Sequence, residues 1–225
     1  MKDHGIFEGE RAQKYDQFTK SWIPAYDSLL HSLPDLLSSK MSADENKVLV
    51  AGCGTGKELL PLAKMKQHWH FTGVDPSPEM LEQAREKLAS FSNVKLLEAY
   101  VSDLPQSDVF QAATLLLVSH FLPDDGTKLT LLQDISERLS SGAPFVMAGI
   151  FGSSQEVQLN LQVLRTLLPP DLDPERVNER IDHIYNNIQY VSENRLTELL
   201  VEAGFVPPIR FFQMAIWGGW ITQKK

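Results

Sequence analysis

The sequence is short of cysteine and of long apolar runs, and each shortage excludes a class of protein. Its 225 residues contain one cysteine, Cys53, which rules out an internal disulfide and favours a reducing cytoplasm. No stretch approaches the ~20 apolar residues of a membrane span. The first residues, Met1 to Ile6, lack the apolar core of a secretion signal. These absences predict a cytoplasmic protein that does not engage a membrane.

Positive charge is also sparse. The chain has 21 basic against 29 acidic residues, a net charge of −8, and no four basic residues in succession. A protein that follows nucleic-acid phosphates usually carries a basic stripe. The composition therefore argues against nucleic acid as a partner and favours a small-molecule substrate. With 43% apolar residues the chain can bury one core, so we expect a single domain over residues 1–225, and a homodimer stays open.

A glycine-rich turn is the most informative feature that is present. Residues 48–50 predict a buried strand, residues 58–65 have a helical pattern, and Gly52, Gly54 and Gly56 lie between them. Glycine permits a positive φ and lets a ligand approach the main chain, and the free N–H groups of the helix face that ligand. A second predicted strand, residues 70–75, ends at Asp75, 19 residues after Gly56. This spacing is typical of a carboxylate that grips the ribose diol of a nucleotide-type cofactor.

Two common glycine-rich motifs do not fit this turn. A dinucleotide motif that starts at Gly52 requires glycine at position 57, where the chain has Lys57. A phosphate loop that ends at residues 56–57 requires glycine at 51 and Ser or Thr at 58, where the chain has Ala51 and Glu58. Hydride transfer is therefore disfavoured, and an NTPase is excluded.

The remaining pattern, G-x-G-x-G over residues 52–56, resembles the first motif of the class I S-adenosylmethionine (SAM)-dependent methyltransferases. Residues 75–80, DPSPEM, resemble their second motif, D-x-S-x-x-M. The resemblance runs from about residue 44 to the end, and it implies SAM as the cofactor, with the adenine beside residues 100–102. The residues that it implies around SAM are Gly52, Cys53, Gly54, Gly56, Asp75, Pro76, Met80, Tyr100, Val101, Asp103 and Val118.

Three positions depart from the family's pattern. Val50 and Tyr100 stand where many members have an acidic residue, and Gln111 stands where an Asp is common. These departures leave the cofactor unchanged. They leave open how the methionine amino group and the adenine are held.

Short apolar segments alternate with amphipathic ones after residue 44, which predicts an α/β fold with a parallel sheet. The family resemblance implies a doubly wound, mostly parallel seven-stranded sheet with an antiparallel final strand. Within it we expect a cofactor-binding half over residues 44–150 and a final helix and strand pair over residues 191–225. Residues 1–40 and 152–190 are expected to form helical caps.

The two caps are predicted from different signals. Tyr15, Phe18, Trp22 and Tyr26 recur at helical spacing, with a break expected near Pro24, and they could pack on the sheet or form a lid. In similar enzymes a helix with the run A-x-x-Y-D closes over the cofactor, which singles out Tyr15. The 152–190 interval far exceeds an ordinary connection of ~2–6 residues. It predicts two helices, 154–167 and 174–187, at the edge of the sheet where ligands bind.

His120 is the best-placed titratable residue, because it follows the predicted fourth strand. It could act as a general base near neutral pH, or it could be a structural histidine. Glu156 and His183 in the cap are weaker candidates. His68 and His70 lack further ligands at metal-binding spacing, so no metal site is expected.

The leading hypothesis is methyl transfer to an oxygen or nitrogen atom of a small metabolite. A rival is a carboxy-SAM synthase of the tRNA wobble-uridine pathway, which the C-terminus also resembles. Those enzymes hold the extra carboxylate with an arginine in the helix before "AGF", where this chain has Leu199, with Arg195 one turn earlier. A third hypothesis is a non-catalytic protein that retains the cofactor fold.

Overall fold

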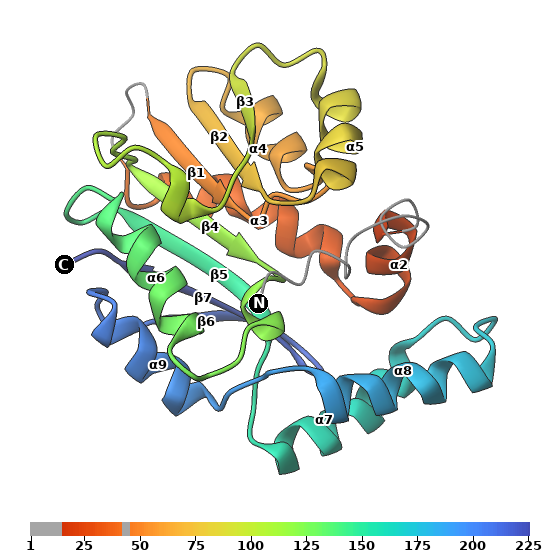
Figure 1. Ribbon diagram of the computed structural model, residues 1–225. Coiled ribbons are helices and arrows are strands. Elements are labelled where there is room, and N and C mark those ends of the chain that lie inside the picture. Colours follow the sequence, from red (N-terminus) through yellow and green to blue (C-terminus); the bar gives the residue numbers. More distant parts are fainter. Residues whose placement is uncertain (1–14, 42–45) are drawn as a thin grey trace.

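A seven-stranded sheet forms the centre of the computed structural model, which describes residues 15–41 and 46–225 (Figure 1). Its strands are β1 (Lys47–Ala51), β2 (His70–Asp75), β3 (Val94–Glu98), β4 (Ala112–Leu116), β5 (Pro144–Ile150), β6 (Ile209–Met214) and β7 (Trp217–Gln223). Their order is β3-β2-β1-β4-β5-β7-β6. The first five strands are parallel, and β7 is antiparallel to both β5 and β6. This arrangement confirms the predicted fold class.

Helices cover both faces of the sheet and bury it in two apolar clusters. One cluster lies under α3 (Tyr26–Ser38), α4 (Leu59–Met65) and α5 (Pro78–Leu88), and the other lies under α6 (Thr127–Glu137) and α9 (Glu193–Glu202). The central strand β1 alternates between them, because Val48 and Val50 join the first cluster and Leu49 and Ala51 join the second. A strand buried on both faces reads as a continuous apolar run, which is why residues 48–51 predict it so well.

Local capping interactions mark the starts of several helices, and α7 and α8 have the predicted bounds. Ser192 accepts a hydrogen bond from the backbone N–H of Arg195 and so begins α9. The Ser153 side chain and the Glu156 carboxylate form a capping box at the start of α7 (Ser154–Leu167). Glu156 therefore has a structural role at the helix terminus. The helix α8 (Pro174–Asn187) has the predicted bounds.

The N-terminal aromatic stripe divides between the core and the cap. The helix α2 (Tyr15–Trp22) ends before Pro24, as predicted, and the chain turns through Ala25, whose φ is +61°, into α3. Trp22 and Tyr26 are buried in the core, whereas Tyr15 and Phe18 are half-buried. Phe18 packs against the same core cluster as Trp22 and Tyr26, so the packing interpretation holds for these three residues, and the lid role of Tyr15 stays a prediction.

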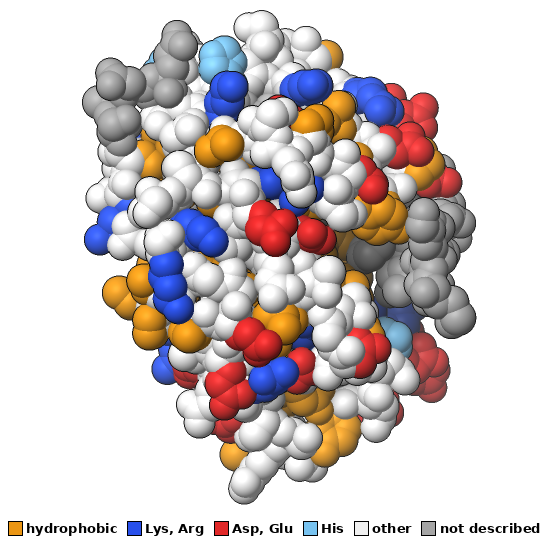
Figure 2. Space-filling model, turned by 60° about the vertical axis from the view of Figure 1, so that its left-hand side comes forward, with side chains coloured by type: hydrophobic (Ala, Val, Ile, Leu, Met, Phe, Trp, Pro, Cys, Tyr) orange, Lys and Arg blue, Asp and Glu red, His pale blue; other side chains and the backbone are white. Residues whose placement is uncertain are grey.

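The cap consists of α2, α7 and α8. Figure 1 shows α2 and the α7–α8 pair on the same side of the sheet, beyond the ends of β1, β4 and β5. On the face shown in Figure 2, basic side chains stand among acidic and apolar ones and form no continuous stripe. Within the described part of the chain, no helix has both the length and the apolar character needed to cross a bilayer.

Candidate active site

The glycine turn takes a backbone path that only glycine follows without strain. Gly52, Gly54 and Gly56 have φ values of +66°, +50° and +76°. Space is as restrictive as conformation, because a Cβ on Gly52 would lie 2.4 Å from Cγ2 of Val118, and one on Gly56 would lie 2.8 Å from Cδ1 of Leu88. The turn thus brings Gly52 against Val118, two of the residues that the family resemblance implies.

Asp75 joins the end of β2 to the glycine turn. Its Oδ2 accepts a hydrogen bond from the Gly54 N–H at 2.8 Å, and its Oδ1 accepts one from the Ser77 N–H at 2.9 Å. Burial raises the pKa of Asp75, and these two hydrogen bonds oppose the increase. The carboxylate is therefore fixed at the tip of β2, beside the turn, as a ribose ligand would have to be.

Two other predicted residues pack around the same turn. The Met80 side chain is buried, and its Cε lies 3.5 Å from where a Cβ on Gly54 would be. Cys53 is buried in the apolar core, and its N–H donates to the Val74 carbonyl at 3.0 Å. Burial raises the pKa of the Cys53 thiol, so this thiol is packing rather than a nucleophile.

The predicted adenine loop lies directly after β3. Val101 is buried, Tyr100 is 37% exposed, and Asp103 closes a short 3-10 helix by accepting from the Tyr100 N–H at 2.9 Å. The loop is adjacent to the ribose residue, since the Ala99 N–H donates to the Asp75 carbonyl at 3.2 Å. Pro76 follows Asp75 and is half-buried. The structure thus brings the loop, Pro76 and Asp75 together at one edge.

Acidic side chains gather beside the glycine turn. Glu58 is buried, and its Oε1 accepts a hydrogen bond from the Thr114 hydroxyl at 2.6 Å. Burial, and then the charges of Asp75, Glu58 and Asp16, raise the pKa of the Tyr15 phenol above its ordinary value. Tyr15 therefore lies within electrostatic reach of three acidic side chains beside the glycine turn.

Asp16 ties the cap to the glycine turn. Its Oδ1 accepts from the Thr55 hydroxyl at 2.6 Å, and its Oδ2 pairs with the Lys87 ammonium. Lys87 also donates to the Thr55 carbonyl at 3.1 Å. Helix α2 is thus held against the turn by charge-assisted hydrogen bonds, which are stronger than neutral ones.

His120 lies in the loop after β4, in a short 3-10 turn over Ser119–Phe121. It is buried, its ring packs against Phe121 with centroids 4.4 Å apart, and its Nδ1 accepts from the Ile150 N–H at 3.4 Å. Burial, and after it the charges of Lys128 and Arg180, lower the pKa of His120 to about 3. The imidazole is therefore neutral at pH 7, and with Nδ1 as an acceptor its proton belongs on Nε2.

A buried lysine fixes this loop against the cap. The Lys128 ammonium donates to the carbonyls of Ser119, Leu122 and Gln189. Three acceptors match its three N–H groups. Burial lowers the pKa of Lys128 to about 8.

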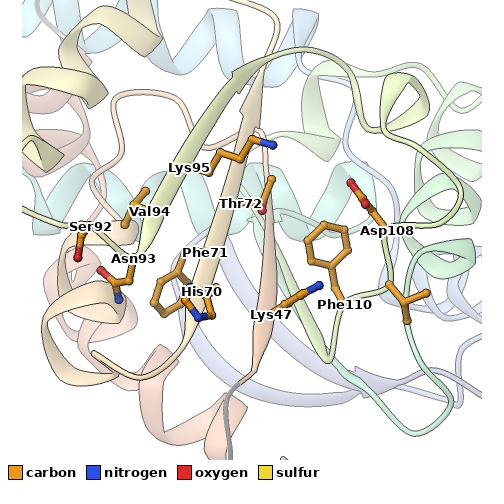
Figure 3. A pocket seen from close by; sticks show the side chains of 11 residues that line it. Lys47, His70, Phe71, Thr72, Ser92, Asn93, Val94, Lys95, Asp108 and Phe110 are labelled. Carbon is orange, nitrogen blue, oxygen red and sulfur yellow. The ribbon is translucent and has the colours of Figure 1, made fainter.

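A pocket of 290 Å³ lies at the opposite end of the parallel strands, where they begin, and is not part of this site (Figure 3). Lys47, His70 and Val94, which begin β1, β2 and β3, all line it. The glycine turn follows the opposite end of β1, about 16 Å away at ~3.3 Å per residue. Over residues 15–41 and 46–225, no cluster of His, Cys, Asp or Glu side chains is arranged to hold a metal ion.

Sequence reasoning missed four residues that shape the site: Glu58, Lys128, Thr114 and Arg180. Glu58 directly follows the glycine turn, so its place could have been noticed. Its partner Thr114 is 56 residues away, and only the pairing of β1 with β4 shows that they meet. Arg180 carries no motif, and the packing of α8 alone reveals its place.

The buried Glu58 gives the protein a specific pH dependence. Burial raises the pKa of Glu58 to about 8 from 4.5, so the folded state binds this proton more tightly than the unfolded state. The contribution of Glu58 to the free energy of unfolding is therefore fully present below about pH 4.5 and is lost as the pH rises through about 8. We expect the Glu58→Gln variant to become more stable relative to wild type as the pH rises from 5 to 8, by on the order of a few kcal/mol.

Urea unfolding at several pH values measures this difference, and subtraction of the wild-type curve removes the other titrating groups. His120 acts in the opposite sense, because its low pKa costs stability as the pH falls from 6.5 toward 3. Glu98→Gln, at an exposed site on β3, is the matched control. A Glu58→Gln difference that stays constant with pH would contradict the assignment.

Comparisons with known proteins agree with this geometry. Residues 48–142 match the family model described as a methyltransferase domain. A carboxy-S-adenosyl-L-methionine synthase of Campylobacter fetus subsp. fetus is 24% identical over 231 residues, which cover 100% of this chain and 96% of that protein. A synthase of the same name from Nautilia profundicola is 32% identical over 85 residues, which cover 38% of this chain and 36% of that protein.

A solved structure shows that the fold is shared along the whole chain. Magnesium protoporphyrin IX methyltransferase from Synechocystis PCC 6803, with bound SAH, superposes with a TM-score of 0.73 at 13% identity, over 99% of this chain and 98% of that one. The glycine turn and Asp75 lie together, where the two sequence motifs predict them. The order of the strands agrees with the predicted doubly wound sheet. The chain therefore has the fold of the class I SAM-dependent methyltransferases and is similar to carboxy-SAM synthases along its whole length, and residues 48–142 match a methyltransferase domain.

Proposed function

We propose that the protein binds SAM at the glycine turn and uses it in a reaction with a small molecule held under the cap. The observation that carries this proposal is the join between the glycine turn and Asp75, whose Oδ2 accepts from the Gly54 N–H at 2.8 Å at the tip of β2. A carboxylate in this position suits a ribose diol and a positively charged cofactor such as SAM, and it disfavours a phosphate at the turn.

The predicted residues divide by the part of SAM that each would contact. Asp75 is the ribose ligand, Pro76 and residues 100–103 flank the adenine, and Gly52, Gly54 and Val118 line the path of the methionine part. Glu58 and Tyr15 lie nearest to the positive end of the cofactor. The cap excludes water and orients the second reactant, which is most of what an in-line displacement at a sulfonium requires.

Two reactions fit such a site, and different observations support each. The Campylobacter relative, which spans the whole chain, favours a carboxy-SAM synthase-like reaction over methyl transfer to oxygen or nitrogen. The helix before "AGF" argues against it, because Leu199 is buried in the core and Arg195 pairs with Asp124 at 2.8 Å. We place the synthase-like reaction first on similarity and keep methyl transfer as the second candidate.

Mass spectrometry separates these reactions without knowledge of the second reactant. The protein is purified, its bound small molecules are released, and the cofactor is identified. A carboxylated SAM supports the synthase-like reaction. SAM or S-adenosylhomocysteine, followed by transfer of a labelled methyl group to a metabolite pool, supports methyl transfer. Failure to bind any of the three compounds, measured by calorimetry, would refute the proposal.

We expect His120→Ala to lower turnover by about 10²-fold and to leave SAM affinity within about twofold, because the ring faces the acceptor side. A group with a pKa of about 3 is a poor base at pH 7, so we assign the neutral ring a hydrogen-bond donor role through Nε2. The wild-type rate should accordingly show no imidazole inflection between pH 5 and 8.

The reaction found by mass spectrometry provides the assay, and calorimetry provides the affinity. His68→Ala, at an exposed site before β2, is the control. A His120 variant that no longer binds SAM would show that the residue supports the fold instead.

A further inference from the structure

We propose that the pocket at the start of strands β1, β2 and β3 binds a small phosphate monoester. This pocket is the 290 Å³ cavity of Figure 3, at the opposite end of the strands from the glycine turn. The inference concerns a second ligand site and does not depend on the proposed function. It starts from a gap in the layer of helices that covers the sheet.

The connection from β3 to β4 lacks the helix that usually covers a parallel crossover. Helices α4, α5 and α6 fill the connections from β1 to β2, from β2 to β3 and from β4 to β5. Residues 99–111, between β3 and β4, form only the short 3-10 helix Val101–Asp103. A right-handed crossover would place a helix here on the face opposite α4 and α5, because the chain crosses the sheet in the other direction. That face is left uncovered where β2 and β3 begin.

The register of the strands puts four polar side chains on this uncovered face. Lys47 is the partner of His70, and Thr72 is the partner of Lys95, in the two parallel pairs. Paired residues, and residues two apart in one strand, point to the same face of a sheet. Leu49, two residues after Lys47, belongs to the apolar cluster under α6 and α9. The four polar residues therefore share the face that α6 and α9 cover elsewhere.

The pocket carries positive charge that is not used in ion pairs. Lys47 and Lys95 line it, and neither forms a salt bridge with any residue that the structure describes. In Figure 3 both lysine side chains extend toward the side of the pocket where Phe110 and Asp108 lie. Asp108 is the one acidic side chain among the described residues of the lining, so the balance is positive. The chain as a whole has a net charge of −8, and an anion is therefore drawn to this pocket.

The other groups of the lining favour a phosphate monoester among small anions. A lysine ammonium is a compact charge with three donors and is a common phosphate ligand. The Thr72 hydroxyl and the His70 ring add further donors. A phosphate monoester has three terminal oxygens to accept from such a set, whereas a carboxylate has two. Val109, which is 45% exposed, and the Phe110 ring provide an apolar wall for the organic part.

The test titrates the full chain with phenyl phosphate in the absence of SAM, followed by protein-observed NMR. At about pH 7.5 the probe is nearly a dianion, and about 0.1 M salt screens charges more than about 10 Å away. We expect a dissociation constant below about 1 mM. Amide signals should shift at residues 47, 70–72 and 92–95 and stay fixed at the glycine turn. Phenol, which lacks the charge, should bind at least about 10-fold more weakly.

Two variants test the lysines separately. Lys47→Gln and Lys95→Gln should each weaken the binding of phenyl phosphate at least about 3-fold, and the double variant at least about 10-fold. Both side chains are exposed, and either single variant serves if the other does not fold. The matched control is Lys64→Gln, at an exposed site on α4. It removes the same charge from the chain and should leave the affinity unchanged.

Three results would overturn the proposal. The first is a wild type that does not bind phenyl phosphate. The second is an equal loss of affinity in the Lys47, Lys95 and Lys64 variants, which would indicate general attraction to charge. The third is a shift of the glycine-turn amides in place of the pocket amides. Calorimetry with SAM tests the proposed function separately, so the failure of one proposal leaves the other standing.

Discussion

The Asp75→Ala variant is expected to bind SAM at least 10-fold more weakly than wild type. The loss corresponds to about 1.5 kcal/mol, the scale of hydrogen bonds to a charged group. The structure adds a second reason, because the carboxylate also accepts from the N–H groups of Gly54 and Ser77. Removing it deprives the glycine turn of one bond and the start of α5 of the other. Calorimetry with SAM measures the effect.

A cofactor analogue separates the ribose contact from damage to the turn. S-adenosylhomocysteine without its 2′-hydroxyl should bind wild type more weakly than complete S-adenosylhomocysteine does. Asp75→Ala should bind these two compounds with about equal affinity. Asp108→Ala, at the opposite edge of the sheet, is the control. Equal affinities of Asp75→Ala and wild type for SAM would remove Asp75 from the ribose site.

The Gly52→Ala variant should lose about 2–5 kcal/mol of the free energy of unfolding. A left-handed φ costs an L-residue ~1–2 kcal/mol, and overpacking adds ~1–3 kcal/mol. At this position φ is +66°, and a Cβ would lie 2.4 Å from Cγ2 of Val118, a β-branched side chain with little rotamer freedom. Denaturant unfolding measures the loss, and we expect weaker SAM binding to accompany it.

Two further variants divide this cost into its parts. Gly142 has a φ of +78°, and no atom of the described residues lies within 4 Å of where its Cβ would be, so Gly142→Ala carries the conformational cost alone. Val118→Ala combined with Gly52→Ala should restore the packing part and leave the conformational part. If Gly52→Ala and Gly142→Ala lower the free energy of unfolding by the same amount, the close approach of Val118 to the turn does not contribute to the loss.

The fold was predictable because its signals are local. Each signal acts on the few residues beside it, and an element begins or ends there. These signals are the apolar run of residues 48–51, the helix N-cap residues Ser153 and Ser192, and Pro24. The two helices of the 152–190 segment were predictable for another reason, since this interval far exceeds an ordinary connection.

The site was predictable only where a motif records it. Gly52 and Gly54 are set by the backbone path, which leaves few residue types available, and Asp75 is set by the two N–H groups that its carboxylate accepts from. Glu58 with Thr114, and Arg180 with Phe18, are contacts between elements that one sequence does not pair. The protonation of His120 was also hidden, because burial and two cations decide it.

The hydrogen bonds of Asp16 have a consequence for the order of events in turnover. This carboxylate holds α2 to Thr55 and to Lys87, so the helix can swing away from the turn only after those bonds break. The second reactant needs the closed cap, so we expect it to bind after the cofactor has bound. We expect steady-state kinetics with SAM as the first molecule to enter and its spent form as the last to leave, at a rate set by the lifetime of the Asp16 link.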